Sequence, residues 1–323
     1  MTAAPQPPPQ RMGGFDLMKH WKKALIALVL AALFAAPAAT AKPYTFFVPI
    51  SEGLSMGSLS NLLREMGKTA EEKTGIEIEV VDYTYQKGEK VRHKVVDMFQ
   101  NNNADFGYMF AQDFIKYAKT GDNTIVPMFT ITLFNKPYSE FCFYTRKDEN
   151  HESLEDMQGL IWGGAHTVAA RYILYKNGID EPLDEFFSNM VFINDSDTAA
   201  MMDALLDHQI DVAVMASFQT GMVTANNKKY NALAETHCTE YEHNWVFVRH
   251  RDLPKDLVNT IKKTFLRAHK DRDFAKFHFI MQAIQGHFVD IDIKDLKTTK
   301  EIVDLAEEHG WYEEEEEFIE KQK

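Results

Sequence analysis

The feature that most limits the possible folds is an alternation of short apolar segments with amphipathic segments over residues 44–133. Three amphipathic segments carry apolar residues at helical spacing, over Ser58–Thr74, Lys90–Gln100 and Gln112–Lys119. Around them lie four segments with the length and composition of buried strands, at Tyr44–Ile50, Ile76–Tyr85, Asp105–Phe110 and Ile125–Leu133. Strands that alternate with helices in this way form a mainly parallel sheet, so we predict an α/β fold.

A second α/β unit begins at Leu160–Leu174, which has the sequence LIWGGAHTVAARYIL. The apolar residues before Gly163 predict a strand, the glycine pair predicts a tight turn, and the residues after His166 predict a helix. Open α/β sheets bind ligands at the carboxyl ends of their strands, and a helix start favours an anion. The turn is therefore either one wall of an anion site or an ordinary strand–helix junction.

This second unit interrupts the first one. The chain leaves the first unit near Lys136–Phe141 and returns to it near Thr239–Val246. We therefore predict one lobe from residues 42–138 and 245–323 and an inserted lobe from residues 139–244. Two mainly parallel sheets joined by two crossings make a hinge with a cleft between the lobes. The acidic run Glu313–Glu317 is predicted to be a solvated tail.

Residues 1–41 are predicted to lie outside the fold. The basic segment Met18–Lys23 precedes the apolar run ALIALVLAALF at Ala24–Phe34, which is short for a membrane span. Ala39-Thr40-Ala41 then supplies a small-x-small cleavage site. We predict a signal peptide cleaved after Ala41, with Met18 as the start and an uncleaved anchor as the alternative. Because no Cys follows the apolar run closely, no lipid is expected there, and the mature protein is predicted to be periplasmic.

Charge and cysteine content narrow the class further. A formal net charge of −13 argues against binding to nucleic acid, which needs a basic surface. The only two cysteines, Cys142 and Cys238, lie beside the two predicted crossings. In an oxidising compartment they either form a disulfide or remain as two buried thiols.

Four segments carry motifs of a known family. They are NADFGY at Asn103–Tyr108, Tyr138-Ser139 with SLEDMQG at Ser153–Gly159, Phe192 with Ala199–Val214, and VFVR at Val246–Arg249 with Asp252-Leu253-Pro254. In order and spacing they resemble the phosphate/phosphonate-binding family of ABC importers, over about Tyr44–Ala306. The resemblance implies a two-lobed fold of the type II periplasmic binding proteins, without a cofactor. It also implies capture of a small solute by lobe closure and delivery to an ABC permease in the inner membrane.

The ligand-binding motifs of that family are only partly present. Its Ser-Thr-Ser-Gly phosphonate turn is matched here by His166–Thr167 alone, in which only the Thr agrees. A Gly-Pro pair that closes one strand of the family is replaced by Phe110–Ala111. Thr198 stands where a His is frequent, and Ser217 where an acid or an amide often stands. The resemblance therefore implies the fold and the class, but it does not carry over the phosphonate.

The loops at the carboxyl ends of the predicted strands supply ten candidate ligand-binding residues: Ser51, Ser55, Tyr85, Tyr108, Phe110, His166, Thr167, Ser196, Thr198 and Ser217. Hydroxyl and backbone N–H groups at helix starts hold an oxyanion without a counter-charge. Three kinds of these side chains also have a structural alternative, which is helix capping for the threonines, solvation for the histidine and core packing for the tyrosines. Glu52 and Asp197 would repel an anion and favour a cationic or zwitterionic solute.

No catalytic or metal-binding pattern emerges from the sequence. It contains no Gly-x-Ser-x-Gly elbow, no P-loop, no Gly-x-Gly-x-x-Gly and no HExxH among its 12 histidines. His237 and His243 flank Cys238 at a spacing that matches no zinc site. We therefore predict a monomeric binding protein, not an enzyme, whose solute is a small oxyanion of the phosphonate or phosphate type. The alternatives are another organic anion or a zwitterion, presented to a receptor or to a non-ABC transporter.

Overall fold

The computed structural model describes residues 42–51, 57–85, 91–193, 198–283 and 285–321. Residues Pro43–Lys323 form one compact unit, and the fold is that of this unit. The predicted signal peptide and its cleavage site lie outside the described residues. Within the described part of the chain, no helix combines the length and the apolar character that a membrane span needs.

The sheet of lobe 1 has six strands in the order β11-β4-β10-β3-β1-β2. Their bounds are β1 Tyr44–Ser51, β2 Ile78–Tyr85, β3 Phe106–Met109, β4 Ile125–Ile131, β10 Val246–His250 and β11 Phe288–Asp290. Strand β1 is parallel to β2 and β3, whereas β10 is antiparallel to β3 and β4, and β11 is antiparallel to β4. The prediction of a mainly parallel sheet was therefore wrong in this respect, and the sheet is mixed. The reason is that β10 returns from lobe 2 and inserts between β3 and β4.

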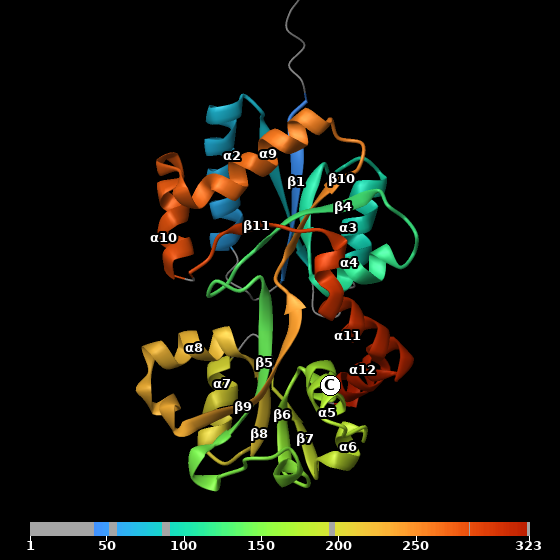
Figure 1. Cartoon of the computed structure of the whole chain (residues 1–323), viewed down its shortest axis with the longest axis vertical. Helices are drawn as coiled ribbons and strands as arrows, with labels where there is room; N and C mark the ends of the chain where they lie inside the picture. The colour runs from blue at the N-terminus through green and yellow to red at the C-terminus, as the bar shows by residue number, and fades with distance from the viewer. Residues whose placement is uncertain (1–41, 52–56, 86–90, 194–197, 284, 322–323) are drawn as a thin grey trace, which may run out of the picture. The chain divides into compact units, whose positions relative to one another are not determined.

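Helices cover both faces of this sheet (Figure 1). They are α2 Gly57–Thr74, α3 Val91–Gln100, α4 Ala111–Ala118, α9 Lys255–Arg267 and α10 Ala275–Ala283. Helices α2, α9 and α10 pack on the face that carries Phe46 and Val48. Helices α3 and α4 pack on the opposite face with Phe47. This division follows from the alternation of side chains along a strand.

The sheet of lobe 2 has five strands in the order β7-β6-β8-β5-β9. Their bounds are β5 Tyr138–Arg146, β6 Ile161–Gly164, β7 Asn189–Phe192, β8 Val212–Ala216 and β9 Leu233–His243. Strand β6 is parallel to β7 and β8, whereas β5 is antiparallel to β8 and β9. The helices are α5 Thr167–Lys176, α6 Leu183–Phe186, α7 Thr198–Leu206 and α8 Ser217–Asn226. This sheet is also mixed, but its β6–α5 and β8–α8 units confirm the predicted strand–helix alternation.

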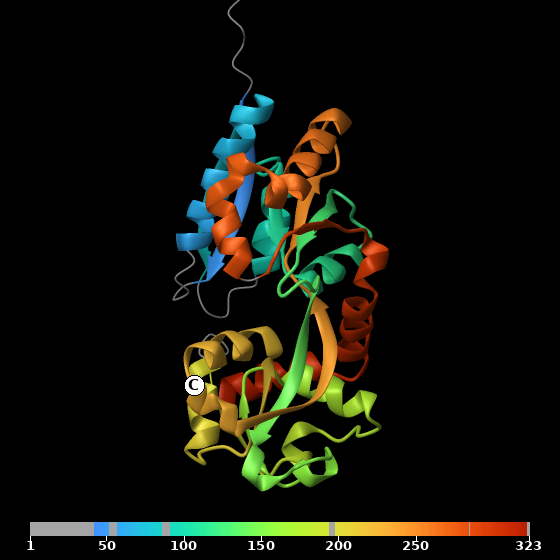
Figure 2. The same cartoon turned by 60° about the vertical axis from the view of Figure 1, so that its left-hand side comes forward.

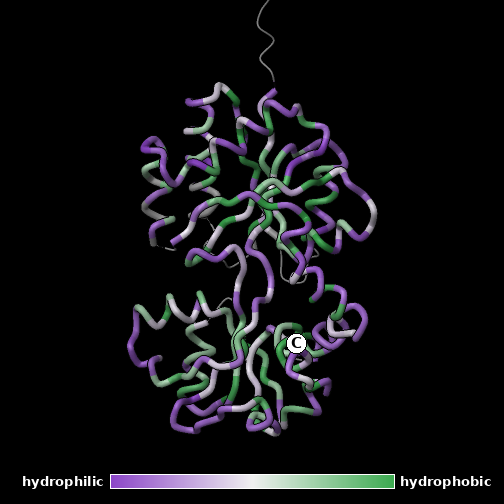
Figure 3. The backbone as a smooth tube through the Cα atoms, in the orientation of Figure 1, coloured by the Kyte–Doolittle hydropathy of each residue, from purple (hydrophilic) through white to green (hydrophobic). Residues whose placement is uncertain are grey.

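Hydrophobic residues gather in the strands of both lobes (Figure 3). Short 3-10 helices complete the connections, at Lys147–Glu149, Glu155–Met157, Lys228–Ala232, Ala268–Lys270, Arg272–Phe274 and Ile293–Leu296. The predicted glycine turn after β6 has a local cause. A Cβ atom on Gly163 would lie 2.5 Å from Cδ1 of Ile210, and Gly164 has a φ of +144°. Both positions therefore need glycine.

Two crossings connect the lobes, through β5 and through β9 with β10 (Figures 1 and 2). Strands β5 and β9 pair from Tyr138 opposite His243 to Arg146 opposite Leu233. The disulfide Cys142–Cys238 joins these two strands, with an S–S distance of 2.10 Å. Asn244, between β9 and β10, donates from Nδ2 to the carbonyl of Ile131 at 2.9 Å and to that of Lys136 at 3.1 Å. The amide of Asn244 therefore fixes the place where the chain returns to lobe 1.

The C-terminal residues differ from the sequence-based expectation. Helix α11 spans Lys297–Glu308, and helix α12 spans Trp311–Lys321. The acidic run Glu313–Glu317 was expected to be a solvated tail, but it is the middle of α12. Trp311 and Phe318, which were expected with lobe 1, are buried in the core cluster of lobe 2. The expectation failed because the seven-residue spacing of these two aromatics, which places them on one helix face, was hidden by the glutamates between them.

Candidate functional site

Helices α4, α5 and α8 begin within three residues of the ends of β3, β6 and β8, respectively, and α7 is the helix that follows β7 along the chain. Figure 2 shows β1 in lobe 1 with its carboxyl end directed toward lobe 2. The first N–H groups of an α-helix have no partner within the helix, and they carry the positive end of its dipole. These helix starts are therefore where the backbone of this chain can hold an anion.

Two candidate residues lie at the adjoining starts of α7 and α8. The hydroxyl of Thr198 donates to Oε1 of Gln219 at 3.2 Å, which joins the first turns of the two helices. Ser217 is the first residue of α8 and is partly exposed. Hydroxyl, amide and backbone N–H groups thus come together at the carboxyl end of β8. Gln219 was missed in the sequence, although a polar residue in the first turn of a helix that follows a strand is a usable signal.

The start of α5 brings together different groups. His166 precedes the helix and makes no side-chain capping bond. Its ring lies 4.8 Å from that of Phe141 in an edge-to-face contact. Thr167 is buried, and its hydroxyl donates to Oε1 of Glu315 in α12 at 3.1 Å. A carboxylate of the chain itself therefore lies where the sequence predicted a solute.

Two candidates of lobe 1 behave differently from each other. Tyr108 is 3% exposed, its hydroxyl donates to the carbonyl of Pro49, and its ring lies 5.9 Å from that of Trp245. These contacts favour the core-packing alternative for Tyr108. Phe110 is 40% exposed at the start of α4, where it offers an apolar surface without a polar group.

The remaining candidates are only partly described. Ser51 ends β1 and Tyr85 ends β2, so their backbones lie at carboxyl ends of strands, as predicted. Nothing is described of their side chains. Ser55 and Ser196 lie outside the described residues, as do Glu52 and Asp197.

A cluster of charged and polar residues at the start of α4 was missed by the sequence analysis. Glu242 on β9 accepts hydrogen bonds from the backbone N–H and the side chain of Gln112. Burial, together with the nearby charge of Asp113, raises the pKa of Glu242 to about 7. The hydroxyl of Tyr312 in α12 donates to Oε1 of Gln112 at 3.0 Å, and the ammonium of Lys116 lies 3.3 Å from the centre of the Tyr312 ring. Strand β9, α4 and α12 therefore meet here beside a crossing.

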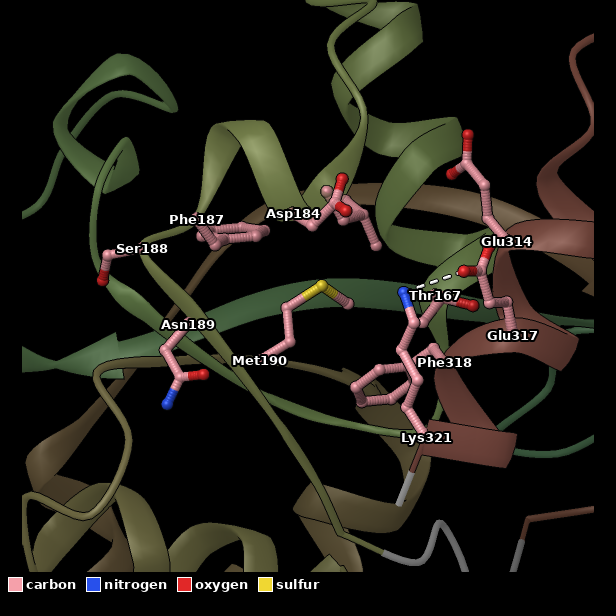
Figure 4. A pocket seen from close by; sticks show the side chains of 11 residues that line it. Thr167, Asp184, Phe187, Ser188, Asn189, Met190, Glu314, Glu317, Phe318 and Lys321 are labelled. Atoms are coloured by element: carbon pink, nitrogen blue, oxygen red, sulfur yellow. Dashed lines mark ion pairs between the residues drawn. The ribbon is translucent and has the colours of Figure 1, made fainter. Parts of the chain in front are cut away.

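A cavity of about 280 Å³ lies between α12, α6 and the start of β7 (Figure 4). Phe187, Met190 and Phe318 contribute to its apolar lining. Its rim carries three carboxylates and one ammonium, from Asp184, Glu314, Glu317 and Lys321. Because this charge is mostly negative, the cavity does not suit an oxyanion.

Metal-ligand side chains approach one another in one place among the described residues, at Cys142, Glu235 and Cys238. Both sulfur atoms of that group form the disulfide. A disulfide sulfur is not a thiolate, so it is not available as a strong metal ligand.

A family described as the periplasmic substrate-binding proteins of phosphonate ABC transporters matches residues 58–296, which is more than half of the chain. The chain belongs to this family. Members of the phosphonate-binding family are transport proteins that carry a small molecule to an ABC permease. No curated protein matches the sequence.

Solved structures agree with the fold of the phosphonate-binding family. PhnD1 from Prochlorococcus marinus, in complex with methylphosphonate, has a TM-score of 0.59 and 13% identity, and covers 83% of this chain and 99% of its own. A phosphonate-transporter binding protein from Pseudomonas aeruginosa has a TM-score of 0.55 and 16% identity over 87% of this chain and 99% of its own. The aliphatic sulphonate-binding protein SsuA from Escherichia coli has a TM-score of 0.53 and 11% identity over 82% and 87%. These similarities confirm the predicted two-lobed type II fold.

Proposed function

We propose that this chain is the periplasmic substrate-binding component of an ABC importer, which binds a small oxyanion of the phosphonate or phosphate type by lobe closure and delivers it to the permease. Support comes first from the phosphonate-binding family to which the chain belongs. The observation that carries the proposal is the joining of the α7 and α8 starts by Thr198 and Gln219, with Ser217 beside them. Neutral donors at helix starts are suited to an oxyanion.

The proposal also covers the oligomeric state of the protein, its processing and the remaining residues of its site. The protein acts as a monomer, makes and breaks no bond in its solute, and does not bind nucleic acid. The signal peptide is removed after Ala41. Ser51, Ser55, Tyr85, Phe110, His166 and Ser196 complete the proposed site around the same solute.

Calorimetric titration of the purified mature protein tests the ligand class. The panel is methylphosphonate, inorganic phosphate, an alkanesulfonate and a neutral amino acid. We expect a phosphonate or phosphate to bind most tightly. If none of the oxyanions binds more tightly than roughly millimolar, the proposal fails. If the amino acid alone binds, the solute is a zwitterion, which Glu52 and Asp197 would favour.

A substitution tests the proposed contacts. Thr198→Val removes one hydroxyl but keeps the shape of the side chain, so we expect about tenfold weaker binding of the best oxyanion. The matched control is Thr224→Val. Thr224 lies on α8, two turns beyond its first residue Ser217, and this variant should bind as the wild type does. Equal affinities of the two variants would remove Thr198 from the site.

A further inference from the structure

The start of α5 already has an anionic partner within the chain. Thr167 is its first residue and is 2% exposed, and its hydroxyl donates to Oε1 of Glu315 at 3.1 Å. Helix starts favour negative charge, so a glutamate carboxylate is chemically similar there to the oxygens of a phosphonate. The carboxylate of Glu315 thus occupies a position at which a solute oxyanion would be stabilised.

Helix α12, which carries Glu315, is firmly attached to lobe 2. Trp311 is 0% exposed and Phe318 is 8% exposed, and both belong to the core cluster of that lobe. The rings of Phe318 and Trp162 lie 5.7 Å apart. Buried aromatics of this size dominate the energetics of packing. Glu315 is therefore a fixed part of the α5 start, and a solute would have to displace a packed helix to replace it.

Charges of both signs lie near Glu315, and the ammonium of Lys116 on α4 acts on it electrostatically. Glu314, Glu317 and Asp184 line the neighbouring cavity together with Lys321 (Figure 4). Arg171 is buried beside these carboxylates. Its Nε forms an ion pair with Glu314 at 3.3 Å, and its Nη1 donates a hydrogen bond to the carbonyl of Glu181. The family match ends at residue 296, so α12 and its glutamates lie beyond the matched segment.

We propose that Glu315 excludes solute oxyanions from the start of α5 and is thereby a specificity-determining residue of this protein. The inference rests on the proposed oxyanion class of the solute. Glu315 holds the Thr167 hydroxyl and repels a second anion at the same place. The helix starts of lobe 2 that hold the oxyanion are then those of α7 and α8, and Thr167 is not a solute contact.

The test uses inorganic phosphate as a probe of the vacated helix start. Glu315→Gln keeps the shape of the side chain and removes its charge. The control is Glu313→Gln, which removes the same charge from an exposed position of the same helix. Thermal unfolding midpoints are measured for both full-length mature variants, with and without phosphate at constant ionic strength. We expect phosphate to raise the midpoint of Glu315→Gln by about 2–4 °C more than that of Glu313→Gln.

A third variant locates the effect. In Glu315→Gln with Thr167→Val, the additional phosphate-dependent shift should disappear, because the hydroxyl that the phosphate would use is gone. Equal shifts in Glu315→Gln and Glu313→Gln would overturn the inference, as would an additional shift that survives Thr167→Val. The proposed function would fail if the wild type bound no oxyanion in the titration. That result does not depend on the variants, so the two failures are distinguishable.

Discussion

At the scale of single residues, Glu242 is a carboxyl group whose charge near neutral pH depends on the fold. Its carboxyl lies against α4, with Asp113 and Lys116 on that helix, Tyr241 on its own strand and Tyr312 on α12. Its pKa is about 7 in the folded chain, against an ordinary value of 4.5. The folded state therefore binds this proton more tightly than the unfolded state does. It follows that the free energy of unfolding falls as the pH rises from about 4.5 to about 7.

Glu242→Gln should remove this part of the pH dependence. Between pH 5 and pH 8, the wild type should lose about 1–3 kcal/mol of stability that the variant keeps. Urea unfolding at the two pH values measures the difference. Glu240→Gln, on the same strand, is the control and should follow the wild type. A Glu242→Gln variant that loses as much stability as the wild type would contradict the expected titration. Burial also raises the pKa of Asp113, so some pH dependence should remain in every variant.

At the scale of elements, α11 and α12 connect the two lobes a third time, beside the two crossings. Lys119 at the end of α4 in lobe 1 pairs with Asp304 of α11 at 2.9 Å and with Glu307. Lys176 at the end of α5 in lobe 2 pairs with Glu301 at 2.8 Å. Exposed pairs of this kind contribute little individually. The attachment of the C-terminal helices therefore depends mainly on their buried apolar residues.

Trp311→Ala should destabilise the protein by about 3–5 kcal/mol, because it leaves a cavity in the core cluster of lobe 2. It should also make α12 a preferred site of limited proteolysis. Glu320→Ala, at an exposed position of the same helix, should stay within about 0.5 kcal/mol of the wild type. Denaturant unfolding and mass mapping of the proteolytic fragments measure both effects. An intact C-terminus in Trp311→Ala would argue against the role of this side chain in holding α12.

Much of the element order could be predicted from the sequence, because apolar periodicity is a local property. The helix expected from Ser58 begins at Gly57 and ends at Thr74, as predicted. Sheet direction was less accessible, since the antiparallel insertion of β10 depends on how the chain returns from lobe 2. The contacts of Thr167 were inaccessible for a similar reason, because its partner Glu315 is 148 residues away. Pairings between distant segments leave no local pattern in the sequence.

At the scale of the whole molecule, the two crossings are bound to each other by Cys142–Cys238, whose sequence separation is 96 residues. A disulfide that closes a loop of this length restricts the unfolded chain and typically stabilises the fold by about 2–4 kcal/mol. Intact mass spectrometry of the exported, unreduced protein tests whether the disulfide forms and whether the signal peptide is cleaved where we propose. We expect a chain that begins at Lys42 and lacks two hydrogen atoms relative to the reduced form. Alkylation of two cysteines without reduction would contradict the disulfide. A first residue other than Lys42 would contradict cleavage after Ala41.

The position of α12 on lobe 2 has a practical consequence. The described chain starts in lobe 1, with β1, and its last helix lies on lobe 2 (Figure 1). Fluorescent proteins fused before Pro43 and after Lys321 would therefore be attached to different lobes, and energy transfer between them would report the proposed lobe closure. Such a sensor needs no insertion into either sheet, so it leaves every strand pairing of the protein untouched.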